Sequence, residues 1–379
     1  IKIGMIRKLL LAFILFFSWK NYSQLTPITP NSKVSILTVG VANESHSLYG
    51  HTALRIQDAS NGFDYIYNYG MFDFRTENFI LKFVKGDLQY YAAAYSYDDF
   101  EYNYRVENRS IYEQILNLSL EEKQQLFEKL NVSLNPETKF YTYKFIDRNC
   151  TTKVIDILNQ VLENKPIQKK NITDATYREV LFPYAKNHFF QKLGINIIFG
   201  TKVDEQETKI FLPFDLYENL KTISYKNKPL VQESKTLFKA TAVDYKSPIW
   251  DTIYCLLGIL LIVVVFNTKT TRYIYFGCIG SIGLLFSLIG LYSFHKEILW
   301  NYNIFLFNPL YLLLIYFTLK NNSEWIKKTV YLCLFSLLIY VLYMLNKVHF
   351  FIVLPIVITN AIVLLRLIVK KEKLLSSVK

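Results

Sequence analysis

Five apolar runs dominate the C-terminal part of this 379-residue chain. They cover residues 249–266, 273–293, 304–319, 329–345 and 350–369. Each has about the length that a helix needs to cross a bilayer, roughly 20 residues. Helices satisfy their own backbone hydrogen bonds, as lipid requires. The sequence therefore predicts a transmembrane domain of five helices over residues 249–379.

Basic residues between these runs indicate their orientation. If the part before residue 249 is exported, the loops between the helices alternate between inside and outside. The outer loops then hold only Lys296 and Lys347. The inner loops and the tail hold nine basic residues: Lys269, Arg272, Lys320, Lys327, Lys328, Lys370, Lys371, Lys373 and Lys379. This asymmetry obeys the positive-inside rule. It predicts a multi-pass membrane protein with its C-terminal tail inside.

The net charge of +12 is a topology signal as well. Residues 24–248 contain 27 basic and 27 acidic side chains, so they contribute nothing to that excess. A nucleic-acid-binding surface needs clustered positive charge on a folded domain. We therefore expect no nucleic-acid partner.

The N-terminal end has the pattern of a secretory signal over residues 1–23. Basic Arg7 and Lys8 precede a short apolar stretch, which is too short to span a bilayer. We expect an exported domain over residues 24–220. The polar, irregular stretch 221–248 is interpreted as a linker to the membrane.

Within the exported domain, strand and helix patterns are mixed without a βαβ alternation. Strands are predicted at 34–39, 52–57, 63–69, 88–97 and 139–146, with a hairpin turn at Asn61-Gly62. Helices are predicted at 79–84, from the capping box at Ser119 to about Leu130, and at 150–162. The fold class is α+β.

Cys150 and His51 are the candidates for chemistry. Cys150 is the only cysteine outside the apolar runs, and it stands where a helix begins. Helix N-termini favour a thiolate and offer N–H groups to an oxyanion. His51 follows a glycine at the start of a strand, where a general base would be held rigidly. A buried, inert cysteine is the simpler alternative.

Further residues are candidates for supporting roles. Asp64 or Asn68 would orient His51, and the sequence does not choose between them. Asn149 would cap the helix or donate to an oxyanion. Candidates for substrate contacts are Tyr49, Arg55, His295 and Asn301, although Arg55 also suits an ion pair and His295 an interfacial loop. No metal-ligand spacing and no phosphate-binding loop is present, so neither metal nor cofactor is expected.

Three motifs resemble the Lnb N-terminal periplasmic domain family. They are residues 49–56 (YGHTALRI), 67–74 (YNYGMFDF) and 147–152 (DRNCTT). The resemblance implies a circularly permuted papain-like (NlpC-type) domain, with Cys150 as nucleophile and His51 as base. It also implies a location in the bacterial inner membrane, with the N-terminal domain in the periplasm and the tail in the cytoplasm.

Members of this family are understood as lipoprotein N-acyltransferases of Bacteroidota. The implied reaction moves an acyl chain from a phospholipid donor, through a thioester on Cys150, to the N-terminal amine of a diacylglyceryl-cysteine lipoprotein. The alternative is a membrane-tethered cysteine amidase or peptidase acting on cell-wall peptides. A third possibility is a non-catalytic assembly factor. Five membrane helices favour lipid substrates over a simple tether.

Overall fold

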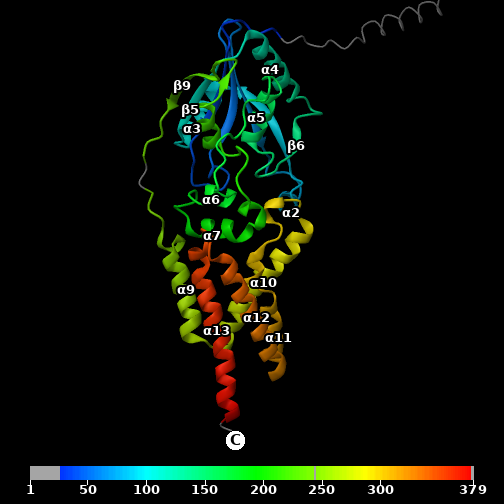
Figure 1. The fold of residues 1–379 in the computed structure, drawn as a ribbon, viewed down its shortest axis with the longest axis vertical. Helices are drawn as coiled ribbons and strands as arrows, with labels where there is room; N and C mark the ends of the chain where they lie inside the picture. Colours follow the sequence, from blue (N-terminus) through cyan, green and yellow to red (C-terminus); the bar gives the residue numbers. More distant parts are fainter. Residues whose placement is uncertain (1–25, 243–244, 377–379) are drawn as a thin grey trace, which may run out of the picture.

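The computed structural model describes residues 26–242 and 245–376, with the backbone alone from residue 370 onward. The predicted signal segment, 1–23, lies outside the described residues. A sheet-rich part is followed by a helical part, and two short helices lie between them (Figure 1). These are α6 (Tyr177–Leu181) and α7 (Phe189–Ile198). The expectation of a mixed domain before a helical region is confirmed.

The N-terminal part is built on an antiparallel sheet, seven-stranded within the described residues. The order across it is β6-β4-β3-β2-β1-β5-β9. The strands are β1 (Lys33–Val39), β2 (His51–Asp58), β3 (Phe63–Met71), β4 (Gln89–Ser96), β5 (Ile111–Leu116), β6 (Phe140–Thr142) and β9 (Val231–Phe238). The β2–β3 hairpin forms as predicted, with Gly62 at φ +69° in its turn.

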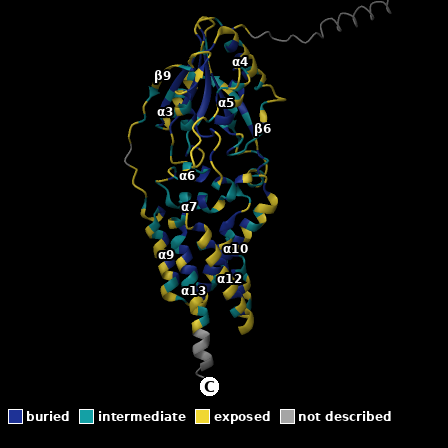
Figure 2. Ribbon diagram, in the orientation of Figure 1, coloured by how far each residue is buried: buried dark blue, intermediate teal, exposed yellow. Residues whose placement is uncertain are grey.

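Helices cover both faces of this sheet, so the central strands β1, β2 and β5 are buried on both sides. One face packs against α4 (Leu120–Val132), α5 (Cys150–Asn159) and α8 (Pro213–Leu220), and the other against α3 (Tyr97–Val106). Successive side chains of a strand point to opposite faces. Ile36 and Leu37 of β1 accordingly join different core clusters, and both are fully buried. The dark blue of the sheet's central strands shows the same burial (Figure 2).

The predicted linker, 221–248, is wrong up to Phe238. This stretch forms the small hairpin of β7 (Ser224–Tyr225) and β8 (Lys228–Pro229), and then β9, which pairs with β5. β9 is the edge of the sheet and most of its side chains are exposed, so it lacks the apolar pattern of a central strand. The strand predicted at 139–146 ends at Thr142 instead, because Lys144 and Arg148 bond to each other across a tight turn.

The C-terminal part is a bundle of α9 (Ile253–Phe266), α10 (Lys269–Tyr292), α11 (Leu310–Leu319), α12 (Ser323–Met344) and α13 (Phe350–Ser376). Within the described residues, four stretches are long and apolar enough to cross a membrane: Lys269–Tyr292, Lys296–Leu319, Ser323–Met344 and Phe350–Val369. The first predicted span, α9, has only 14 residues. At 1.5 Å per residue that is about 21 Å, less than a hydrocarbon core.

The loop between α10 and α11 is packed tightly against the sheet-rich part. A Cβ on Gly200 would lie 1.9 Å from the carbonyl oxygen of Leu299, and one on Gly86 would lie 3.0 Å from the ring of His295. The next loop on this side places Lys347 3.5 Å from Asp204. Both loops predicted to share a side with the exported domain therefore contact it.

Candidate active site

His51 and Asn68 meet on neighbouring strands. The backbone before His51 has a conformation open to glycine alone: Gly50 has φ +83°, and a Cβ there would lie 2.6 Å from the carbonyl oxygen of Val39. The register places Ala53 opposite Asn68, which brings Asn68 level with the start of β2. Nε2 of His51 lies 2.7 Å from the amide oxygen of Asn68. Because that oxygen only accepts, Nε2 carries the hydrogen and Nδ1 is the basic nitrogen in the neutral ring.

Cys150 is the first residue of α5, and α5 is fixed against β2 at this end. The hydroxyl groups of Thr151 and Thr52 are 3.0 Å apart, which ties the first turn of the helix to the residue after His51. Gly70, at φ +90°, lies in a register shift of β3. A Cβ on Gly70 would lie 3.7 Å from that of Cys150, so the shifted strand passes directly beside Cys150.

The thiol and the imidazole change each other's ionisation. Burial by itself raises the pKa of the Cys150 thiol, but the charge and hydrogen bond of His51 and the backbone N–H of Thr52 outweigh it and lower that pKa. Burial by itself lowers the pKa of His51, yet the interactions with Cys150 and Asn68 raise it overall. Both side chains are half-buried. These shifts favour a thiolate–imidazolium pair.

Asn149 is the helix cap and has no N–H left for an oxyanion. Its side-chain oxygen accepts from the N–H of Thr152 at 2.9 Å, and its amide donates to the carbonyl oxygens of Phe145 and Phe211, both at 2.8 Å. The oxyanion alternative for this side chain is therefore wrong. The first N–H groups of a helix have no partner within it, so those of Cys150 and Thr151 remain the candidates for oxyanion donors.

Asp64 and Arg55 belong to an ion-pair network away from the imidazole. Arg55 binds Asp64 at 2.6 Å and Glu113 at 3.1 Å, and its guanidinium lies 3.6 Å from the ring centroid of Tyr97. Of the two candidates for orienting His51, the structure selects Asn68. The phosphate-binding alternative for Arg55 is not favoured, because carboxylates already occupy its guanidinium.

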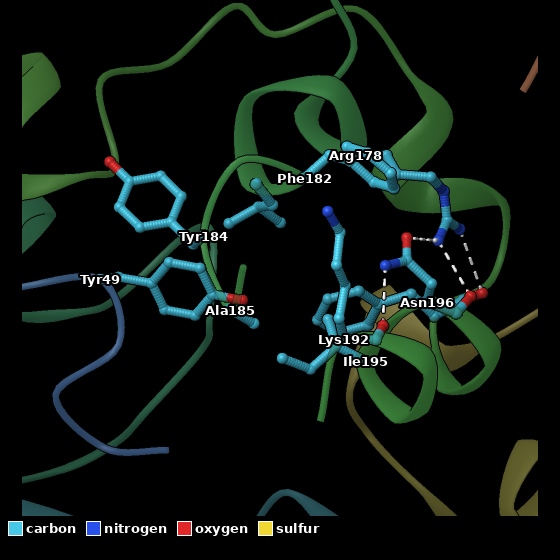
Figure 3. Close-up of a pocket in the computed structure, with 10 residues that line it drawn as sticks. Tyr49, Arg178, Phe182, Tyr184, Ala185, Lys192, Ile195 and Asn196 are labelled. Carbon is cyan, nitrogen blue, oxygen red and sulfur yellow. Dashed lines mark hydrogen bonds between the residues drawn. The ribbon is translucent and has the colours of Figure 1, made fainter. Parts of the chain in front are cut away.

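Tyr49 lines a small cavity rather than the Cys150–His51 pair. Its ring packs edge-on against Tyr184 and Phe145, and α6 and α7 supply most of the other walls (Figure 3). Lys192 projects into this space, with its Nζ 3.7 Å from the ring centroid of Phe182. The cavity volume of about 10 Å³ has room for about one water molecule. It cannot hold a lipid.

His295 and Asn301 bind the sheet-rich part of the chain. Nε2 of His295 lies 2.8 Å from the carbonyl oxygen of Phe83. Asn301 donates to the carbonyl oxygens of Ile197 and Ile198, at 2.8 and 3.0 Å. Their side chains serve the junction between the two parts, and neither is brought to Cys150 by these contacts.

Glu297 supports the candidate site, and the sequence analysis did not identify it. It is buried, and its carboxylate accepts the N–H of Ile146 at 3.1 Å. The membrane-side loop therefore supports the segment that leads into Cys150. The available signal was a lone acidic residue between two apolar runs.

Residues 21–181 match the family model described as the Lnb N-terminal periplasmic domain. This part of the chain is similar to an Lnb domain. The match includes His51, Asn68 and Cys150 and ends before the membrane helices. No curated protein and no solved structure matches the chain. Together with the four apolar spans among the described residues, the match indicates a membrane protein whose N-terminal domain belongs to a periplasmic family.

Proposed function

We propose that this protein is a lipoprotein N-acyltransferase that works through a thioester on Cys150. The observation that carries the proposal is the position of the His51 imidazole, whose Nε2 lies 2.7 Å from the amide oxygen of Asn68 and which also interacts with the Cys150 thiol. Cysteine, histidine and asparagine in these roles are the triad of papain-like enzymes. Here histidine precedes cysteine in the chain, as a circular permutation of that fold requires.

In the first half-reaction, the Cys150 thiolate attacks the ester carbonyl carbon of a phospholipid. The carbonyl oxygen becomes an oxyanion, held by the first backbone N–H groups of α5. When the C–O ester bond breaks, the His51 imidazolium gives its proton to the departing alkoxide. The products are a thioester on Cys150 and a lysophospholipid.

In the second half-reaction, the α-amine of a diacylglyceryl-cysteine lipoprotein attacks the thioester carbonyl. His51, now neutral, accepts the proton that the amine loses, while the C–S bond breaks and the thiolate returns. A covalent intermediate thus divides the synthesis of one amide into two easier steps. Asn68 keeps the imidazole in the same orientation for both steps.

The membrane part supports this reaction because both substrates are lipids. The loop 293–303 and Lys347 lie on the side of the N-terminal domain. The opposite ends of α10, α11 and α12 carry basic residues predicted inside, namely Lys269, Arg272, Lys320, Lys327 and Lys328. This arrangement supports a cytoplasmic tail and a site at the outer surface of the inner membrane. We assign the shorter α9 the role of fifth membrane helix.

The proposal is tested in a strain that relies on this protein for lipoprotein maturation. Cys150→Ala and His51→Ala variants are expected to leave lipoproteins with a free N-terminal amine, as mass spectrometry of their N-terminal peptides would show. Normal N-acylation with either variant, at wild-type abundance in the membrane, would refute the proposal. Release of peptide from cell-wall fragments without lysophospholipid would favour the amidase instead.

A further inference from the structure

The helix α2 (Phe79–Lys85) carries apolar side chains that no other part of the described structure covers. It contains no buried residue. Ile80 is 72% exposed and Leu81 60%, and Phe74, just before the helix, is 72% exposed. Together with Thr76, Asn78 and Phe79, they line an open depression of about 620 Å³. A contiguous apolar patch of this kind marks an interaction surface.

The position of α2 beside the end of a membrane-spanning helix indicates that lipid covers its apolar patch. Three bonds fix it to the end of α10: Ser293 donates to the carbonyl oxygen of Val84, the N–H of Phe294 donates to that of Lys85, and His295 binds that of Phe83. The α10 span ends at Tyr292. The patch is therefore held at the height where a membrane helix leaves the bilayer (Figure 1).

Aromatic rings continue from this patch to the nucleophile. The centroids of Phe74 and Phe72 are 4.9 Å apart, those of Phe72 and Tyr90 are 5.4 Å apart, and those of Tyr90 and Tyr143 are 4.5 Å apart. A Cβ on Gly70 would touch both Tyr143, at 3.9 Å, and Cys150, at 3.7 Å. A row of packed aromatic rings, exposed at Phe74 and buried at Tyr90, thus connects α2 with Cys150.

We propose that α2, with Phe74, dips into the outer leaflet and admits the acyl chain of a phospholipid to Cys150. The inference rests on the proposed function and adds the route by which its donor arrives. The ester carbonyl lies next to the polar headgroup, so a donor that stays in the leaflet brings its carbonyl to a site just above the surface. The row of rings from Phe74 through Phe72 and Tyr90 links the exposed patch to Cys150 and gives the direction of this approach.

Photo-cross-linking of the full chain in phospholipid nanodiscs tests the contact directly. The probe is a phosphatidylethanolamine with a diazirine in its acyl chain. Adducts are expected on the peptide spanning residues 74–83, besides those on the membrane helices. The exposed apolar residues Tyr102 (69%) and Val106 (68%) of α3 are the matched control and should remain unlabelled. Adducts confined to the membrane helices would overturn the inference.

A double substitution, Ile80→Glu with Leu81→Glu, distinguishes entry of the acyl chain at α2 from the reactivity of Cys150. It is expected to slow lysophospholipid release from bilayers at least about tenfold, because carboxylates resist entry into lipid. Alkylation of Cys150 by iodoacetamide should be unchanged. The control pair is Tyr102→Glu with Val106→Glu.

The outcomes distinguish the two proposals. An unchanged bilayer rate for the α2 variant would overturn the acyl-chain route while the acyltransferase stands. Lipid adducts at 74–83 in a wild-type protein that releases no lysophospholipid would instead refute the acyltransferase and keep the contact of α2 with lipid.

Discussion

The amide oxygen of Asn68 accepts a hydrogen bond of 2.7 Å from Nε2 of His51. This bond fixes both the tautomer and the direction of the ring, since Nδ1 is left free to take the thiol proton. Asn68 is fully buried, so water cannot replace it readily. The geometry makes Asn68 a positioning residue for His51, with no contact to the reacting atoms required.

Asn68→Ala should therefore slow acyl transfer by about 10²-fold, the scale expected when a catalytic group is misplaced by about 1 Å. Asp64→Asn, on the same face of β3, should leave the rate unchanged. Lysophospholipid release from proteoliposomes measures both, after thermal melts have shown that the variants are folded. Equal rates for Asn68→Ala and the wild type would contradict the role of Asn68.

Alkylation of Cys150 should follow a pH profile displaced by His51. The pKa of the wild-type thiol is lowered from 9.0, so the alkylation rate rises with pH and levels off below that value. In His51→Ala the burial that raises the pKa remains while the imidazole that lowers it is gone. The midpoint should then move to higher pH than in the wild type. Iodoacetamide rates from pH 5 to 10 measure the shift, and coincident profiles would disprove it.

Gly200→Ala should weaken the junction between the N-terminal domain and the membrane part. The new Cβ would lie 1.9 Å from the carbonyl oxygen of Leu299, and such overpacking costs about 1–3 kcal/mol. Gly194 of α7 is the matched control, because a Cβ there meets nothing within 4 Å. Thermal unfolding in nanodiscs should show a lower midpoint for Gly200→Ala alone. Equal midpoints for the two variants would argue against tight packing at the junction.

Arg55→Met should lower stability rather than substrate affinity. It would leave the buried carboxylate of Glu113 without its partner, a change that costs about 3–5 kcal/mol. Chemical denaturation is expected to show this loss, while the KM for phospholipid stays the same in the folded fraction. A raised KM at unchanged stability would restore the hypothesis that Arg55 binds a phosphate.

The choice between Asp64 and Asn68 shows where sequence reasoning stops. They are four residues apart on one strand, so alternation places both on the same face. Only the hairpin register separates them, because Asn68 pairs with Ala53 and Asp64 with Gln57. Four residues of strand are about 13 Å, which puts Asp64 beyond the reach of His51.

Sequence patterns of neighbouring residues correctly predicted the features of the fold that depend on neighbouring residues alone. The helix start at Cys150, the strand start near His51 and the capping box at Ser119 all follow from neighbouring residues. The pairing of β9 with β5 depends on residues more than 100 positions apart, and the polar edge strand carries no apolar signal of its own. The docking of His295 and Glu297 likewise depends on a surface distant in sequence.

The carboxylate of Glu297, from the membrane side, holds the backbone four residues before the nucleophile. A fragment that ends before α9 would lose that acceptor. It would also lose the contacts of His295 with Gly86 and of Leu299 with Gly200. The geometry around Cys150 is thus a property of the intact polypeptide, and purification in lipid is the condition under which the proposed chemistry should be measured.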